Sequence, residues 1–154
     1  MSQSAIRGCF GIFKEAVESA AILPEAVRAL DWAAEKIGCD CFFISTNAEA
    51  SWVKEALSRN RLDSHFQLVL GRRDGKKEEH FLKISKTNEF KNFIFLGDNL
   101  QDFPSNWNGR ALRIAVGVPP GEKRKFEDAN IDIVHSGPLN TEVMMEVIEK
   151  AGKI

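Results

Sequence analysis

Short runs of apolar residues alternate along this chain with segments in which apolar residues recur every three to four positions. Five of the runs have the length and the nearly continuous apolar content of strands that are covered on both faces. They are residues 41–46 (CFFIST), 66–70 (FQLVL), 93–96 (FIFL), 112–116 (LRIAV) and 131–134 (IDIV). Their alternation with helical segments is typical of βαβ units built around a parallel sheet.

The segments between these runs have the spacing of amphipathic helices. We expect helices at residues 25–37, 49–59, 77–86, 121–128 and 141–151. In the third, Phe81, Leu82 and Ile84 form the expected apolar stripe, and the hydroxyl of Thr141 is the expected cap of the last. The pattern therefore predicts one α/β domain over residues 1–154, a doubly wound, Rossmann-like and mostly parallel sheet with helices on both faces.

Length and composition narrow the class of protein. A chain of 154 residues suits one domain with a core of its own. Its 21 basic and 22 acidic side chains argue against a nucleic-acid partner. No apolar run is long enough to cross a membrane, and the N-terminal residues do not resemble a signal peptide. Three cysteines, Cys9, Cys39 and Cys41, suit free thiols in the reducing cytoplasm.

Polar residues end or follow the first three predicted strands, where ligands of doubly wound sheets bind. They are Ser45, Thr46, Lys76, Lys77, Asp98 and Asp102. A hydroxyl and a lysine can bind the oxygens of a phosphate, and carboxylates can hold Mg²⁺ beside it. The strand ends therefore predict a site for a phosphorylated small molecule.

Each of these residues also has an ordinary structural interpretation. Thr46 can cap the following helix, the two lysines can be solvated, and the two aspartates can be turn residues. Arg72 and Arg73 join the lysines in a basic loop, which can attract an anionic substrate but which we interpret as solvated. The three histidines are scattered, and we expect them at the surface or in loops.

These motifs resemble those of the haloacid dehalogenase (HAD) superfamily, in particular its phosphoglycolate-phosphatase-like and phosphoglucomutase-like members. Residues 22–47 are similar to the helix and strand that lead to the second motif, with Thr46 (or Ser45) as its hydroxyl. Residues 97–102 (GDNLQD) match the fourth motif, GDxxxD. Residues 111–140 are similar to the closing strand, loop, short helix and last strand, so that the resemblance covers residues 22–151.

The resemblance implies a Mg²⁺-dependent phosphatase acting on a small phosphate ester. In this family pattern Thr46 and Lys77 bind the phosphoryl group, and Asp98 binds the metal with support from Asp102. Lys76 is the alternative to Lys77, because the proline that often follows the family's lysine is absent here. Neither the substrate nor the oligomeric state follows from the sequence.

The family's first motif, DxDx[TV], whose first aspartate is the nucleophile, is missing. Residues 1–21 are interpreted either as a cap or linker remnant of a longer protein, or as a degenerate first strand with Gly8 and Phe10 at the two aspartate positions. In the second case residues 4–10 pair between strands 41–46 and 93–96; otherwise another chain covers the opening.

Either interpretation predicts little or no turnover by this chain, because the carboxylate that forms the aspartyl-phosphate is absent. The alternative is a noncatalytic phosphate-binding or regulatory module on the same fold. A receiver-like signalling domain is disfavoured, since it requires an early acidic pair and an acceptor aspartate.

Overall fold

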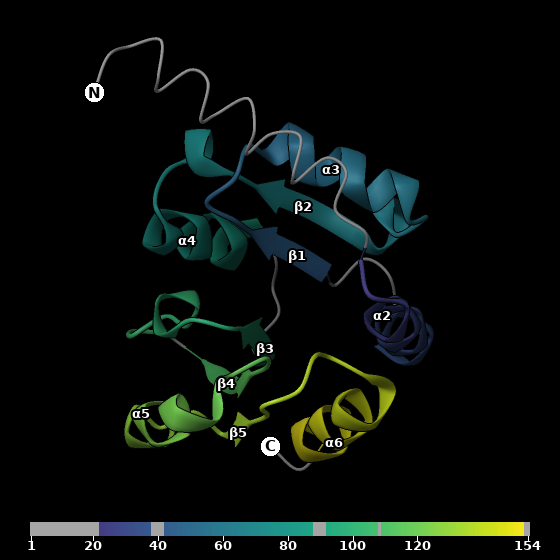
Figure 1. Cartoon of the computed structure of the whole chain (residues 1–154). Coiled ribbons are helices and arrows are strands. Elements are labelled where there is room, and N and C mark those ends of the chain that lie inside the picture. The colour runs from purple at the N-terminus through teal and green to yellow at the C-terminus, as the bar shows by residue number, and fades with distance from the viewer. Residues whose placement is uncertain (1–21, 38–41, 88–91, 108, 153–154) are drawn as a thin grey trace, which may run out of the picture.

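The strands form two parallel sheets. The computed structural model describes residues 22–37, 42–87, 92–107 and 109–152. In the first sheet β1 (Phe42–Ser45) pairs with β2 (Phe66–Leu70), and in the second the order is β3 (Asn92–Gly97), β4 (Arg110–Ala115), β5 (Ile133–Val134). Figure 1 shows the two sheets one above the other. The predicted α/β class and parallel pairing are confirmed.

Helices lie on both sides of the strands. They are α2 (Pro24–Ile37), α3 (Ala50–Arg59), α4 (Lys77–Thr87), α5 (Lys123–Asp128) and α6 (Thr141–Ala151), joined by short 3-10 turns that include η3 (Arg72–Asp74), η4 (Leu100–Asp102) and η5 (Pro120–Glu122). In Figure 1, α2 and α6 lie on one side of the strands, with α4 and α5 on the other. Among the described helices, none has the length and apolar character needed to span a membrane.

Two details of the helices differ from the sequence prediction. The cap of α6 is Asn140, whose side-chain oxygen accepts a hydrogen bond from Val143 N at 2.9 Å, so the hydroxyl of Thr141 is not the cap. The expected helix at residues 121–128 is divided into η5 and α5, because the chain turns after Pro119 and Pro120 before the α-helical bonds begin.

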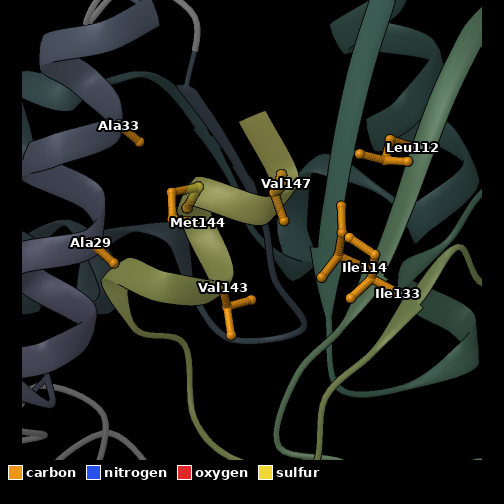
Figure 2. Packing of buried hydrophobic residues seen from close by; sticks show 8 residues of the cluster. All are labelled: Ala29, Ala33, Leu112, Ile114, Ile133, Val143, Met144 and Val147. Atoms are coloured by element: carbon orange, nitrogen blue, oxygen red, sulfur yellow. The ribbon is translucent and has the colours of Figure 1, made fainter. Parts of the chain in front are cut away.

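The largest core cluster of the described residues joins α2 and α6 to the second sheet. Ala29 and Ala33 of α2 pack against Val143, Met144 and Val147 of α6 (Figure 2). The small side chains of α2 allow the two helices to approach closely, and Leu112, Ile114 and Ile133 complete the cluster from β4 and β5. On the opposite face, a second cluster contains mostly aromatic side chains, among them Phe81, Phe95, Phe103 and Phe126.

Helix α4 buries a different stripe from the one predicted. Leu82 has 54% of its surface exposed, whereas His80, Phe81 and Ile84 are buried. Together with the half-buried Lys77, these residues have the spacing i, i+3, i+4, i+7 of one helix face. The face that α4 turns toward β1 therefore carries two polar residues as well as two apolar ones.

A cleft of about 820 Å³ separates β1 from β3. Its lining includes five consecutive residues of β3, from Phe93 to Gly97, and both Phe42 and Phe43 of β1. The cleft is partly open to solvent, and most of its lining surface is apolar. An apolar surface of this kind is typical of a site that another segment or molecule covers. Residues 4–10, which we expect between these strands, lie outside the described part of the chain.

Candidate functional site

The predicted site residues meet at the end of the cleft that is formed by the carboxyl ends of β1 and β3. Thr46, Lys77, Asp98 and Asp102 all line it there, as does Ser45. Thr46 directly follows β1, Lys77 is the first residue of α4, and the two aspartates lie in the turn after β3. The elements thus bring together residues that are up to 57 positions apart, between Ser45 and Asp102. We call this set of five residues the polar rim.

Lys77 connects the two sheets across the polar rim. Its Nζ donates a hydrogen bond to Ser45 O at 2.7 Å and lies 2.9 Å from Asp102 Oδ1. The side chains of Lys77 and Asp102 are only 13% and 15% exposed, so that solvent screens this ion pair weakly. Lys76 is exposed and is not among the residues that line the cleft. Of the two lysines proposed from the sequence, Lys77 is the one that lies at the site.

Asp98 and Asp102 have different surroundings in the turn after β3. Asp102 Oδ2 accepts hydrogen bonds from the backbone N–H groups of Asn99 at 3.1 Å and Asp98 at 3.3 Å. A Cβ added at Gly97 would lie 2.4 Å from Asp102 Cβ, so the glycine leaves room for this packing. Asp98 is exposed, and its carboxylate accepts a bond of 3.4 Å from Asn99 Nδ2. Asp102 therefore organises the turn, while Asp98 faces solvent.

Thr46 extends the pairing of the first sheet and forms a local turn. Its backbone N–H donates to Leu70 O at 2.9 Å, and its Oγ1 accepts a bond from Ala48 N at 3.1 Å. The residue that precedes α3 is Glu49, whose side chain makes no capping bond to that helix. Thr46 thus does not cap α3, and its hydroxyl proton is available to a ligand at the polar rim.

The half-buried Ser45 and the buried His80 form a pair that the sequence interpretation missed. Ser45 Oγ lies 2.8 Å from His80 Nδ1, and His80 Nε2 lies 3.0 Å from Gly71 O. A carbonyl only accepts, so Nε2 carries the proton and Nδ1 accepts from the serine hydroxyl. Burial lowers the pKa of His80, as do Lys77 and Lys83, against the opposing effects of Gly71 O and Asp74.

The expectation of a surface or loop position is therefore wrong for His80, which is 1% exposed. The signal that could have placed it is its position three residues after Lys77, on the face that also carries Phe81 and Ile84. A polar pair at i and i+3 on a buried face requires partners, and β1 and the Gly71 carbonyl supply them.

The basic loop after β2 holds a buried carboxylate rather than being simply solvated. Glu49 is 7% exposed, and its Oε1 accepts bonds from Arg72 Nε at 2.6 Å and Arg73 Nε at 2.9 Å. Burial raises the pKa of Glu49, but the two arginines outweigh that effect and hold the pKa below its usual value. Arg72 also lies over the ring of Trp52. These contacts fix the loops after β1 and β2 against each other.

The donors at the polar rim suit a metal ion only in part. Within the described ranges, no three His, Cys, Asp or Glu side chains are grouped to hold a metal. Asp98 offers one exposed carboxylate, whereas both oxygens of Asp102 already have protein partners. One carboxylate fits the way in which Mg²⁺ is often bound in proteins, where water and phosphate oxygens complete the octahedron.

Comparison with known proteins gives no assignment for this arrangement. No family model matches the chain, and neither a curated protein nor a solved structure matches it. Its function has therefore to be inferred from the polar rim and the cleft themselves.

Proposed function

We propose that this chain is a HAD-like phosphatase-type domain that binds a small phosphate ester together with Mg²⁺ at the polar rim, with little or no turnover of its own. The observation that carries this proposal is the position of the Lys77 ammonium, which lies between the end of β1 and the turn after β3. The ends of parallel strands are where such folds bind their ligands.

Lys77 and Thr46 supply the donors for phosphate oxygens. An ammonium group has three N–H donors, and Ser45 O and Asp102 Oδ1 occupy two of those of Lys77. The third has no partner among the described residues, and neither has the hydroxyl proton of Thr46, so both can bind a phosphate oxygen. The partly buried position of Lys77 strengthens its attraction for an anion, because nearby water is limited.

Asp98 is the residue that would hold Mg²⁺. Its exposed carboxylate lies in the same turn as Asp102, which orients the backbone around it. When bound, the metal supplies positive charge that neutralises the phosphoryl oxygens. Asp102 acts from behind this turn and positions both Asp98 and Lys77.

A noncatalytic binding module is the second candidate, and one observation favours it. Of the described residues that line the cleft, Asp98 and Asp102 are the only ones with carboxylates. If Asp98 holds the metal and Asp102 pairs with Lys77, neither is left as a nucleophile toward phosphorus. Binding without turnover is the expected behaviour of such a site.

We also propose that the two sheets are parts of one doubly wound, Rossmann-like sheet. Both are parallel, helices cover both faces, and the edges of β1 and β3 face the same cleft. The cysteine content, an odd number of three, supports free thiols and therefore a cytoplasmic location for this domain.

The proposal is tested by titrating the whole chain with inorganic phosphate in the presence and absence of MgCl₂, followed by calorimetry and by the thermal unfolding midpoint. We expect saturable binding that raises this midpoint and is stronger with Mg²⁺. Lys77→Met should weaken phosphate binding at least about tenfold, the loss of one charge-assisted bond. The matched control is Lys76→Met, which removes the same charge one residue away and should bind normally.

Turnover is measured with p-nitrophenyl phosphate and Mg²⁺. We expect hydrolysis near the uncatalysed rate. Hydrolysis at ordinary enzyme rates that is abolished by Asp98→Asn would overturn the expectation of an inactive chain. Equal phosphate binding by Lys77→Met and Lys76→Met would overturn the proposed site.

A further inference from the structure

We propose that the cleft between β1 and β3 is a docking slot for one parallel β-strand, and that residues 5–10 of this chain (AIRGCF) occupy it. The proposal rests on the shape and lining of the cleft and is independent of phosphate binding. β1 and β3 would then flank the inserted strand, one on each side.

The first step is that the cleft runs along strand edges. Successive residues of a strand point to opposite faces, so a cavity over one face contacts every second residue. This cleft contacts the five consecutive residues Phe93 to Gly97 of β3, and adjacent residues Phe42 and Phe43 of β1. The other edge of β1 is paired with β2, and that of β3 with β4. The remaining edges, with their N–H and C=O groups, face each other across the cleft.

The second step is the direction of the strands. Lys77 contacts Ser45 O at the end of β1 and Asp102 just after the end of β3. The carboxyl ends of the two strands therefore lie together at the polar rim. Because the same cleft also extends from there along both strands, β1 and β3 point the same way. One strand inserted between them can run parallel to both and satisfy both edges, which is the arrangement in the interior of a parallel sheet.

The third step is that both faces of the slot have apolar walls. Helices α2 and α6 supply Leu30, Ala33, Met144 and Ile148 on one side, and α4 supplies Phe81 and Ile84 on the other. A strand with helices over both faces is apolar at successive positions rather than at alternate ones. The occupant should therefore be a short, nearly continuous apolar segment.

Residues 5–10 belong to the stretch before α2, residues 1–21, and they meet that requirement. The other stretches outside the described ranges are at most four residues long, and the internal ones are tied at both ends to β1, β3 or their neighbours. Residues 5–10 contain one charged residue, Arg7, and are otherwise apolar or glycine. The six-residue segment is as long as β3.

The connection to the described chain is long enough. After residue 10, thirteen residues lead to Pro24, where α2 begins, and α2 leads into β1. An extended chain of that length reaches about 40 Å, and a 14-residue helix spans about 21 Å. The inserted strand, α2 and β1 would then form a βαβ unit, in which α2 is the crossover helix and covers one face of the slot.

Hydrogen–deuterium exchange of the unmodified full-length chain tests the proposal directly. We expect the backbone amides of residues 5–10 to exchange at least about 100-fold more slowly than in an unstructured peptide. The amides of residues 42–45 and 93–97 that do not bond to β2 or β4 should be protected to a similar degree. Exchange of residues 5–10 at the unstructured rate would overturn the proposal.

Substitutions within residues 5–10 then test whether the protection of this segment and the protection of the two strand edges depend on each other. Ile6→Asp and Phe10→Asp place a charge in the slot and should reduce protection of residues 5–10, 42–45 and 93–97 together. Leu82→Asp is the matched control, because Leu82 is 54% exposed on the outer face of α4. If either variant unfolds globally, the exchange pattern of the unmodified chain still decides the outcome.

A second copy of the chain is the competing occupant. Sedimentation of the unmodified chain distinguishes it: we expect a monomer in which residues 5–10 are protected. A dimer in which residues 42–45 and 93–97 are protected while residues 5–10 exchange freely would place another chain in the slot and overturn the proposal.

Discussion

Asp102 and Lys77 form an ion pair of 2.9 Å that connects the turn after β3 to the first residue of α4. The other carboxylate oxygen of Asp102 accepts bonds from the N–H groups of Asp98 and Asn99. One side chain therefore determines both the position of the lysine and the shape of the turn that carries Asp98. It also connects the sheet of β1 and β2 to the sheet of β3, β4 and β5.

Replacing Asp102 with asparagine should destabilise the protein. Asp102→Asn retains the shape of the side chain but leaves the poorly exposed Lys77 ammonium without its counter-charge. We expect the free energy of unfolding in urea to fall by about 1–3 kcal/mol. Asp128→Asn is the control: its carboxylate is 73% exposed and 3.9 Å from Arg124, so the loss should stay below about 0.5 kcal/mol. Equal losses in the two variants would contradict the importance of the Asp102–Lys77 pair.

Replacing Asp98 should affect metal binding and leave stability unchanged. The carboxylate of Asp98 is exposed, so Asp98→Asn should alter the unfolding free energy by less than about 0.5 kcal/mol. The affinity for Mg²⁺ in the presence of phosphate should fall at least about tenfold, because the hard oxygen ligand becomes an uncharged amide. Calorimetric titration with MgCl₂ measures this. Asp63→Asn, at another exposed position outside the cleft lining, should bind Mg²⁺ normally.

The buried histidine predicts how stability depends on pH. The pKa of His80 is lowered from 6.5 in the folded protein, chiefly by burial, whereas the unfolded chain keeps the ordinary value. Below about pH 6.5 the unfolded state therefore binds a proton that the folded state does not. Stability should be fully present above this pH, and should decline as the pH falls toward the lowered pKa.

Urea unfolding between about pH 7.5 and about pH 5 measures this decline. In His80→Gln this part of the pH dependence should disappear. His135→Gln should retain it, because His135 lies in the loop after β5 and makes no contact with Ser45 in the described structure. A decline of the same size in His80→Gln and in the unmodified protein would show that another group is responsible.

Adding one methyl group at Gly97 should disturb the polar rim. The Cβ of Gly97→Ala would lie 2.4 Å from Asp102 Cβ, so the aspartate has to move away from Lys77 and from the turn. We expect a loss of about 1–3 kcal/mol in unfolding free energy, together with weaker phosphate binding. Gly121→Ala is the matched control, since its Cβ would meet nothing within 4 Å. Unchanged phosphate binding by Gly97→Ala would show that the position of Asp102 does not affect phosphate binding.

The elements and most of the site residues follow from local sequence patterns. The strand at residues 66–70 and the helix at residues 141–151 have the predicted bounds, because buried runs and helical periods are local properties. The carboxyl ends of parallel strands meet at one edge, which is why Thr46, Lys77, Asp98 and Asp102 could be placed together.

Other features depend on contacts that local patterns do not encode. Burial of His80 depends on its bond to Ser45, 35 residues earlier in the chain. The cap of α6 is Asn140 because its side chain reaches Val143 N. Asn140 and Thr141 are both residue types that cap helices, so the sequence alone does not decide between them. The division of the strands into two sheets depends on which strand edges pair. The spacing of apolar residues along each strand does not determine that pairing.

The packing of α2 against α6 sets a minimum time for folding during synthesis. Ala29 and Ala33 are made early, but their partners Val143, Met144 and Val147 are added more than 100 residues later. At roughly 5–20 residues per second, a ribosome needs about 5–25 s to make that stretch. Through this interval Ala29 and Ala33 lack their α6 partners, whereas Val27 and Leu30 can already pack against the cluster of Leu57, Leu62 and Val69.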